Sequence, residues 1–205
     1  MTPDVVVIDS GGANIASLLY ALQRLGARAE LSVDAARIRT ASHVLLPGVG
    51  AAHDTMQRLN GNGLAALIPT LTQPVLGICL GMQLLYSASS EAASGSTATR
   101  GLGIVAGEVE RLRASPDQPV PHMGWNQLEL LADDPLFNGI AAGTYFYFVH
   151  SYAAPLSADT LAACEYDGRF TAVVRRDNFR GVQFHPERSA GAGARLLANF
   201  IALQE

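Results

Sequence analysis

The sequence predicts an α/β fold, an open, mostly parallel twisted sheet with helices on both faces and added antiparallel strands. Hydrophobic residues make up 49% of the 205 residues and charged residues only 16%, which is typical of a compact globule with a substantial core. In the first half, short apolar runs alternate with stretches of helical periodicity, which is the pattern of a parallel sheet covered by helices. Shorter strand-like runs fill the second half, and they predict the added strands.

Runs rich in apolar residues mark the predicted strands of the first half, and helical spacing marks the segments between them. The run VVVID is continuous and apolar, as in a buried parallel strand. After it, apolar side chains recur at Ile15, Leu18 and Leu22, and Gly26 is a natural C-cap. The predicted strands are 5–9, 27–33, 43–47 and 74–78, and the predicted helices begin at residue 14 and lie within 48–59 and 80–89.

The second half has a different pattern. Residues 87–100 (SASSEAASGSTATR) are small and polar, which predicts a surface loop. Strand-like runs separated by turns follow, and we expect them to extend the same sheet, some of them antiparallel. A final helix over 190–203 carries one apolar stripe, and we see no internal repeat or linker, so the sequence predicts a single domain over 1–205. The strand-like runs are 102–112, 126–131, 144–152, 161–166, 170–176 and 180–184.

Composition narrows the classes of function. The net charge of −4 gives no general reason to bind nucleic acid or an anionic membrane, and no apolar run reaches the ~18 residues of a membrane span. The chain opens without a signal-peptide pattern, and its two cysteines suggest no disulfide framework, so we expect a reducing cytoplasm. All 14 basic residues are Arg, which excludes Schiff-base lysines, Ser-Lys dyads and P-loop lysines.

Cys79 stands in the pattern Gly-Ile-Cys-Leu-Gly between a predicted strand and a predicted helix. This is the layout of a nucleophile elbow, in which a sharp turn exposes the side chain at the strand end and the glycines relieve crowding. The start of a helix favours a thiolate, and the N–H of Leu80 can face a developing oxyanion. The elbow alone leaves a packed core thiol about equally well supported, because cysteine is among the most often buried residues.

A second pattern, GVQFHPERS, supplies a base and a group to orient it. Residues two apart in extended backbone face the same side, so Glu187 can hold one nitrogen of His185 while the other faces Cys79. The LPGVG segment places glycines at the end of another strand, where backbone N–H groups of Val49 or Gly50 could complete an oxyanion hole. Taken alone, Pro-Gly is a weak signal, because it usually marks a turn.

These segments carry a specific resemblance over essentially the whole chain. PGVG, GICLGMQ and VQFHPE, in this order, resemble the class I, triad-type glutamine amidotransferases. PHMGWN, YFVHSY and DSGGANIAS make the chain similar to the glutaminase subunits of imidazole glycerol phosphate synthases, from histidine biosynthesis. The resemblance implies that Cys79 attacks the carboxamide of L-glutamine, that His185 shuttles the proton, and that Glu187 orients His185.

The resemblance also implies ligands and a partner. Glutamine would be held by Gln83, the PGVG loop with Gly48, and the strand that carries His150, Ser151 and Tyr152. Ammonia would pass through a protected channel to a separate (β/α)8-barrel cyclase, which makes imidazole glycerol phosphate and AICAR, and the two proteins would form a heterodimer. No metal or cofactor is implied. The residues expected at the partner interface are Asn14, His122, Met123, Trp125, Asn126 and Tyr147.

One stretch departs from the family pattern, and two other interpretations stay open. The commoner family pattern is Asp-Tyr-Gly-x-Gly-Asn-Leu, but Ser10, Ala13 and Ile15 replace its Tyr, second Gly and Leu, which leaves coupling at the interface loop open. One alternative function is the glutaminase of another amidotransferase, or a cysteine hydrolase or peptidase of the same fold. The other is a catalytically silent binding module, which would require a broken triad.

Overall fold

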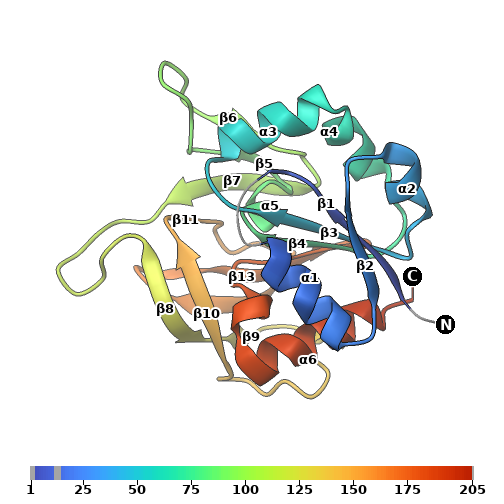
Figure 1. Cartoon of the computed structure of the whole chain (residues 1–205). Coiled ribbons are helices and arrows are strands. Elements are labelled where there is room, and N and C mark those ends of the chain that lie inside the picture. Colours follow the sequence, from blue (N-terminus) through green and yellow to red (C-terminus); the bar gives the residue numbers. More distant parts are fainter. Residues whose placement is uncertain (1–2, 12–14, 205) are drawn as a thin grey trace.

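The computed structural model describes residues 3–11 and 15–204. It consists of a main twisted sheet with helices on both faces and smaller sheets packed at one end (Figure 1). In the main sheet, β2, β1, β3, β4 and β14 are parallel, and β13, β12 and β9 continue the sheet in antiparallel fashion. The strands in spatial order are β2 (Arg28–Ser32), β1 (Asp4–Ile8), β3 (His43–Gly48), β4 (Val75–Cys79), β14 (Phe179–Val182), β13 (Arg169–Arg176), β12 (Thr160–Glu165) and β9 (Glu129–Leu130).

The inner parallel strands β1, β3, β4 and β14 form because both of their faces are buried, whereas β2 at the edge of the sheet is largely exposed. On β1, Val5 and Val7 belong to one apolar cluster, and Val6 and Ile8 belong to a second cluster on the opposite face. Each fully buried side chain of this size stabilises the fold by about 1.5–3 kcal/mol relative to an exposed one. The continuous apolar run therefore corresponds to a strand between two helical layers, as predicted.

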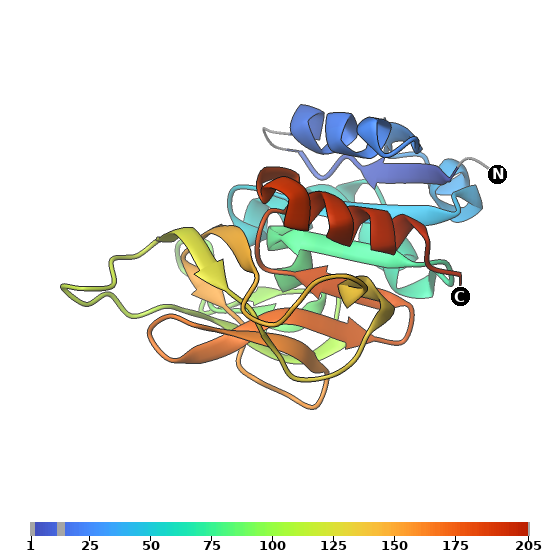
Figure 2. The same ribbon diagram turned by 90° about the horizontal axis from the view of Figure 1, so that it is seen from below.

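Different helices cover the two faces (Figures 1 and 2). Side chains of α1 (Ile15–Arg24) and α6 (Ala190–Ile201) pack in the first apolar cluster. The opposite cluster receives α2 (Ala35–Thr40), α3 (Ala52–Gly61) and α4 (Leu64–Leu67), and the 3-10 turn η1 (Ile68–Thr70) follows α4. The sequence did not predict α2, which is short and begins where the Asp34 carboxylate accepts the N–H of Ala36 at 2.8 Å.

The expectation that all second-half strands extend the main sheet is wrong for several of them. Among the described residues, β10 (Tyr145–His150) and β8 (His122–Gln127) pair only with each other, and a further sheet has the order β11-β7-β5-β6. These strands lie beyond the carboxyl ends of the parallel strands (Figure 1). Periodicity shows that a segment is extended but not which strand it pairs with. The strands of the further sheet are β11 (Tyr152–Ala153), β7 (Val105–Arg111), β5 (Tyr86–Ser89) and β6 (Thr99–Arg100).

The helix expected over 80–89 is also shorter than predicted. Only α5 (Leu80–Gln83) is helical, and the chain then enters β5. β5 pairs with β6 and β7, so the predicted loop 87–100 has strand residues at both ends. Tertiary pairing here overrides an apolar spacing that also suits a helix.

Neither a membrane span nor a metal cluster is found in the described part of the chain. No helix within 3–11 and 15–204 combines the length and apolar character that crossing a bilayer requires. Over the same residues, no group of three or more His, Cys, Asp or Glu side chains is arranged to hold a metal ion.

Candidate active site

The carboxyl ends of three neighbouring strands meet at Cys79. β4 ends at Cys79, β3 runs beside it with Gly48 in register with Cys79, and β14 on the other side leads into the segment of His185. Parallel strands deliver their last residues to one edge of a sheet. The arrangement brings together motifs that are more than 100 residues apart.

Cys79 adopts the strained backbone of a nucleophile elbow. Its φ of 54° and ψ of −111° lie in a backbone region that residues other than glycine rarely occupy. Such a conformation costs roughly 1–3 kcal/mol and persists only where the surroundings enforce it. α5 begins at the next residue but spans only Leu80–Gln83, so free N–H groups rather than a long helix dipole lie beside the thiol.

The glycines of the elbow are required by close backbone packing. A Cβ on Gly77 would lie 2.7 Å from the carbonyl oxygen of Gly81, and a Cβ on Gly81 would overlap the carbonyl oxygen of Leu46. A Cβ on Gly48 would lie 2.8 Å from the backbone nitrogen of Gly81. The absent side chains let α5 turn back tightly onto β3 and β4, which holds the strained turn in place.

His185 and Glu187 form the expected pair. His185 Nδ1 lies 2.9 Å from Glu187 Oε1, and both side chains are almost fully buried. The backbone between them differs from the prediction, because only His185 is extended and the 3-10 turn η3 (Pro186–Arg188) begins next. Pro186 occupies the first position of this turn, where its fixed φ and missing N–H are accommodated.

His185 is also hydrogen-bonded to the Cys79 side chain, while its Nδ1 is engaged with Glu187. Burial by itself lowers the pKa of His185, but hydrogen bonds and charge interactions with Cys79 and Glu187 outweigh it and raise the pKa to about 10. A protonated imidazole beside a cysteine favours the thiolate, which is the nucleophilic form. The Cys79 Sγ also lies 3.7 Å from the carbonyl oxygen of Val149 and 3.7 Å from Nε2 of Gln183.

A cavity of about 630 Å³ opens in front of Cys79. All residues predicted for the oxyanion hole and for substrate binding line it, together with Cys79 and His185. Gly50 there has a φ of 95°, a conformation that a residue with a side chain would adopt only under strain. The full lining is Gly48, Val49, Gly50, Cys79, Leu80, Gln83, Glu91, Pro121, Val149, His150, Ser151, Tyr152, His185 and Arg188.

The whole chain resembles known amidotransferases. Residues 6–203 match the family model of the class-I glutamine amidotransferases. Proteins named imidazole glycerol phosphate synthase subunit HisH are 50% identical in Yersinia pseudotuberculosis and 48% identical in Vibrio cholerae, with 98% and 99% of this chain and 100% of each relative covered. This chain belongs to the class-I glutamine amidotransferases of the HisH group. The amidotransferase is therefore a glutaminase.

Two solved structures share the fold of this amidotransferase. A putative GMP synthase component from Thermoplasma acidophilum superposes with a TM-score of 0.74 at 19% identity, covering 98% of this chain and 93% of the other. The PurLQS structure from Thermotoga maritima superposes with a TM-score of 0.71 at 19% identity, covering 98% of both chains. At this identity the likeness shows the fold alone, and it confirms the predicted fold class.

The expected substrate residues of the amidotransferase are bonded to one another. His150 Nδ1 lies 2.8 Å from the carbonyl oxygen of Tyr152, and Gln83 Nε2 donates to that same oxygen at 2.8 Å. His150 Nε2 lies 2.9 Å from Nδ1 of His122, so both ring nitrogens of His150 are engaged within the protein. His150 therefore contributes to the cavity wall through its position, and Ser151 follows it along the wall.

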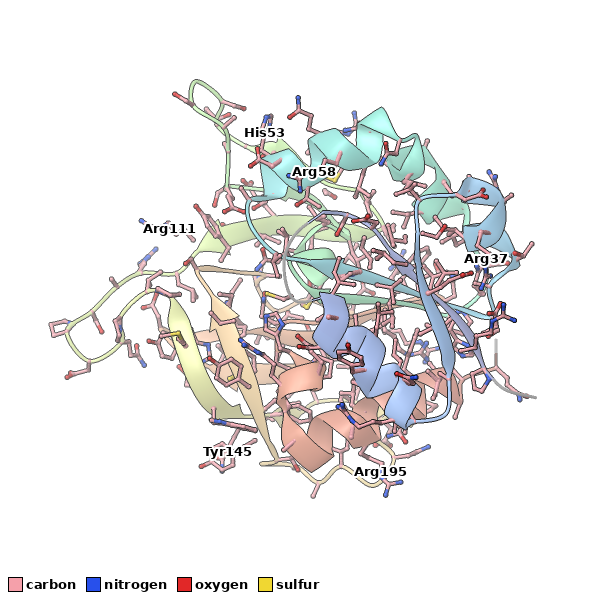
Figure 3. All side chains as sticks on the ribbon, viewed as in Figure 1. Arg37, His53, Arg58, Arg111, Tyr145 and Arg195 are labelled. Atoms are coloured by element: carbon pink, nitrogen blue, oxygen red, sulfur yellow. The ribbon has the colours of Figure 1, made fainter. Side chains whose placement is uncertain are left out.

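The expected interface residues divide into exposed and buried ones. Met123 and Trp125 are 67% and 52% exposed, while Asn126 and Tyr147 are less accessible. His122 is 3% exposed, so its side chain lies inside the protein rather than on the surface. Tyr145 at the start of β10 is 51% exposed and extends away from the body of the molecule (Figure 3). Asn14 and Ala13 lie outside the described residues.

Sequence reasoning missed residues that hold the site. Gln183 is fully buried next to Cys79. The sequence feature that could have indicated it is a polar Gln within the otherwise apolar strand-like run 180–184. The Ser189 hydroxyl donates to the carbonyl oxygen of His185 at 2.7 Å and accepts the N–H of Tyr147 at 2.9 Å, which joins the catalytic segment to β10. Glu91 brings a carboxylate to the cavity, where its Oε2 accepts the N–H of Ala52 at 2.8 Å.

Ser10, one of the departures from the family pattern, has a clear structural role. Its hydroxyl is buried and donates to the carbonyl oxygen of Pro47 at 2.7 Å. Pro47 immediately precedes the loop of Gly48 and Val49, so Ser10 ties the first strand end to the start of this loop. A small hydroxyl thus supplies a direct bond at a position where the commoner family residue is a Tyr.

The pKa of His185 predicts how stability depends on pH. An unfolded histidine titrates near ~6.5, and the folded-state pKa is about 10. The stabilisation is therefore fully present below ~pH 6.5 and is lost as the pH rises through the folded-state pKa. Removing the Glu187 charge in Glu187→Gln lowers the folded-state pKa and shrinks this contribution. Urea unfolding of both proteins at pH 6, 8 and 10 should show a stability difference that narrows with rising pH, and a constant difference would contradict the assignment.

Proposed function

We propose that this amidotransferase is the glutaminase subunit of an imidazole glycerol phosphate synthase and that Cys79, His185 and Glu187 are its catalytic triad. The observation that carries the proposal is the strained Cys79 at the end of β4, which shares one cavity with His185, while buried Glu187 is bonded to the other ring nitrogen of His185. A nucleophile, a base and a group that orients the base are the parts that acyl transfer requires. In this proposal one domain over 1–205 carries the whole glutaminase site.

The reaction follows from this geometry. The Cys79 thiolate attacks the carboxamide carbon of L-glutamine, and the resulting oxyanion is stabilised by backbone N–H groups of Leu80 and of Val49 or Gly50. The tetrahedral intermediate collapses by breaking the C–N bond, and the His185 imidazolium gives its proton to the leaving ammonia. Neutral His185 then takes a proton from water, which attacks the thioester and releases glutamate and the thiolate. Glu187 keeps the ring oriented throughout.

The cavity supplies charge complementarity for the rest of the substrate. Glutamine is a zwitterion, and the carboxylate of Glu91 in the cavity wall suits its α-ammonium group. The Gln83 amide oxygen and the Ser151 hydroxyl are available for its other polar atoms, because the Gln83 amide nitrogen and the Tyr152 carbonyl oxygen are already bonded within the protein. Gly48 also lines the cavity, although its missing side chain is required by the close packing against Leu80 and Gly81.

The partner in this proposal is a (β/α)8-barrel cyclase that receives the ammonia in the cytoplasm. Met123 and Trp125 on β8, with Tyr145 on β10, form an exposed group that we call the β8–β10 surface. Aromatic residues and Met are enriched at the centre of protein interfaces. Arg188, which lines the cavity, stacks over the ring of half-buried Tyr147 at 5.7 Å and so connects the cavity with this surface.

The test measures glutamine hydrolysis with and without the cyclase and its nucleotide ligand. We expect the complex to hydrolyse glutamine faster than the isolated glutaminase, and Trp125→Ala to weaken complex formation by about tenfold or more, because a central Trp is a frequent interface hot spot. Leu31→Ala is the control, since Leu31 is 41% exposed on β2 at the far edge of the main sheet.

The outcomes separate the alternatives. Glutamine hydrolysis without any complex with the cyclase would favour the glutaminase of another amidotransferase. Failure of Cys79 to react with a glutamine-like electrophile would favour a silent binding module. Equal binding of the cyclase by the Trp125 and Leu31 variants would move the interface away from the β8–β10 surface.

A further inference from the structure

We propose that His122 is a positioning residue for the glutaminase reaction, acting through a buried chain of hydrogen bonds that joins β8 to the Sγ of Cys79. The inference rests on the proposed function, because it concerns the same nucleophile. It assigns a role to a side chain that the resemblance placed at the partner interface but that the structure places inside the protein.

The outer half of this hydrogen-bond chain runs from β8 to the cavity wall. Asn126 Nδ2 lies 3.3 Å from Nε2 of His122, and Nδ1 of His122 lies 2.9 Å from Nε2 of His150. Nδ1 of His150 then lies 2.8 Å from the carbonyl oxygen of Tyr152. His122 and His150 are also directly opposite each other in the β8–β10 pairing.

The direction of these bonds is determined by groups that can act in only one way. A carbonyl oxygen only accepts, so Nδ1 of His150 carries the proton and its Nε2 is an acceptor. His122 must then donate from Nδ1 and accept at Nε2, and the amide nitrogen of Asn126 only donates. Both imidazoles are therefore neutral. Burial, the largest cause in each case, lowers the pKa of His122 to about 4 and that of His150 to about 3, which agrees with this assignment.

The inner half continues to the nucleophile. Gln83 Nε2 donates to the carbonyl oxygen of Tyr152 at 2.8 Å and to Oε1 of Gln183 at 2.9 Å. Nε2 of Gln183 then faces the Cys79 Sγ at 3.7 Å. Gln83 and Gln183 are 5% and 0% exposed, so water does not readily replace these bonds.

Packing holds His122 in the orientation that the chain needs. Its ring stacks on Tyr166 with centroids 4.0 Å apart and on Phe148 with centroids 4.9 Å apart. Its neighbour Met123 and the nearby Trp125 are exposed on the β8–β10 surface. The strand β8 therefore carries both Met123 and Trp125 of the β8–β10 surface and the outer end of the hydrogen-bond chain that reaches the thiol.

The test separates the hydrogen bond of His122 from its stacking. His122→Phe keeps an aromatic ring but leaves His150 Nε2 without its donor, whereas His122→Asn keeps an amide N–H near the position of Nδ1 and loses the stacking. The readouts are the rate at which a chloroketone analogue of glutamine labels Cys79 and kcat/KM for glutamine. We expect both to fall about tenfold in His122→Phe and to recover to within about threefold in His122→Asn. His53→Phe is the control, because His53 is exposed on α3 (Figure 3).

A purely structural role gives a different result. In that case both His122 variants lose activity in proportion to their loss of stability in urea unfolding, or keep the wild-type labelling rate, and either result overturns the proposal. ¹⁵N NMR of the wild-type imidazoles provides a test that no variant needs to survive. A proton on Nε2 rather than Nδ1 of His150 would break the chain and reject the inference.

The outcome is also distinguishable from failure of the proposed function. If the wild type with the cyclase does not hydrolyse glutamine but His122→Phe still slows the labelling of Cys79, the positioning role stands and the proposed reaction does not. If the wild type hydrolyses glutamine and Cys79 is labelled at the wild-type rate in the His122 variants, the proposed reaction stands and the positioning role of His122 does not.

Discussion

Cys79→Ala is expected to abolish glutamine-dependent synthesis by the complex with the cyclase while synthesis from added ammonia continues. Without the thiol no thioester can form, and removing the nucleophile of a catalytic triad costs on the order of 10⁴–10⁶ in kcat. Ammonia supplied from solution bypasses the glutaminase site, so the cyclase reaction is spared. The measurement is the rate of imidazole glycerol phosphate formation from glutamine and from ammonium salt.

The other cysteine of the chain provides a matched control. Cys164 is 2% exposed on β12, and burial raises its pKa to about 12, so it stays a thiol in the core. Cys164→Ala should keep both the glutamine-dependent and the ammonia-dependent rates, with only a loss of stability from the small cavity. Glutamine-dependent turnover that survives Cys79→Ala would reject Cys79 as the nucleophile.

Gly81→Ala is expected to have the largest effect on stability, a loss of about 3 kcal/mol in the free energy of unfolding. The new Cβ would overlap the carbonyl oxygen of Leu46, a rigid backbone atom of β3 that a rotamer change cannot move away. The turn would have to shift, and Cys79 would shift with it. Urea unfolding should therefore show a lower midpoint, and the folded fraction should label Cys79 more slowly.

Gly191→Ala is the corresponding control. Gly191 lies in α6, and a Cβ built there meets no atom within 4 Å. Alanine favours the helix, so this variant should gain roughly 0.5 kcal/mol in the free energy of unfolding. Equal losses of stability in the two variants would show that close packing of the elbow is not the reason for its glycines.

The sequence predicted those parts of the fold and site that depend on neighbours in the chain. Buried parallel strands such as 5–9 are continuous apolar runs because both faces are covered. The turn at Cys79 follows from glycines two residues to either side, and the His185–Glu187 bond joins residues two apart. Local steric and spacing rules therefore predict where the buried strands lie along the sequence and that Cys79 stands on a sharp turn.

Only the tertiary structure decided which distant segments meet. Three features depend on contacts between residues far apart in the sequence: the separate pairing of β8 with β10, the burial of His122, and the approach of Gln183 to Cys79. His122 and His150 are 28 positions apart, and Cys79 and Gln183 are 104 positions apart. Sequence periodicity carries no information about strand partners or about which polar side chains share a buried network. The glycines around Cys79 alone indicate that it could be reactive. The hydrogen bonds of Gln183 and Gln83 and of His150 and His122, which lead to its sulfur, exist only because folding buries these polar groups side by side, where they must bond to one another.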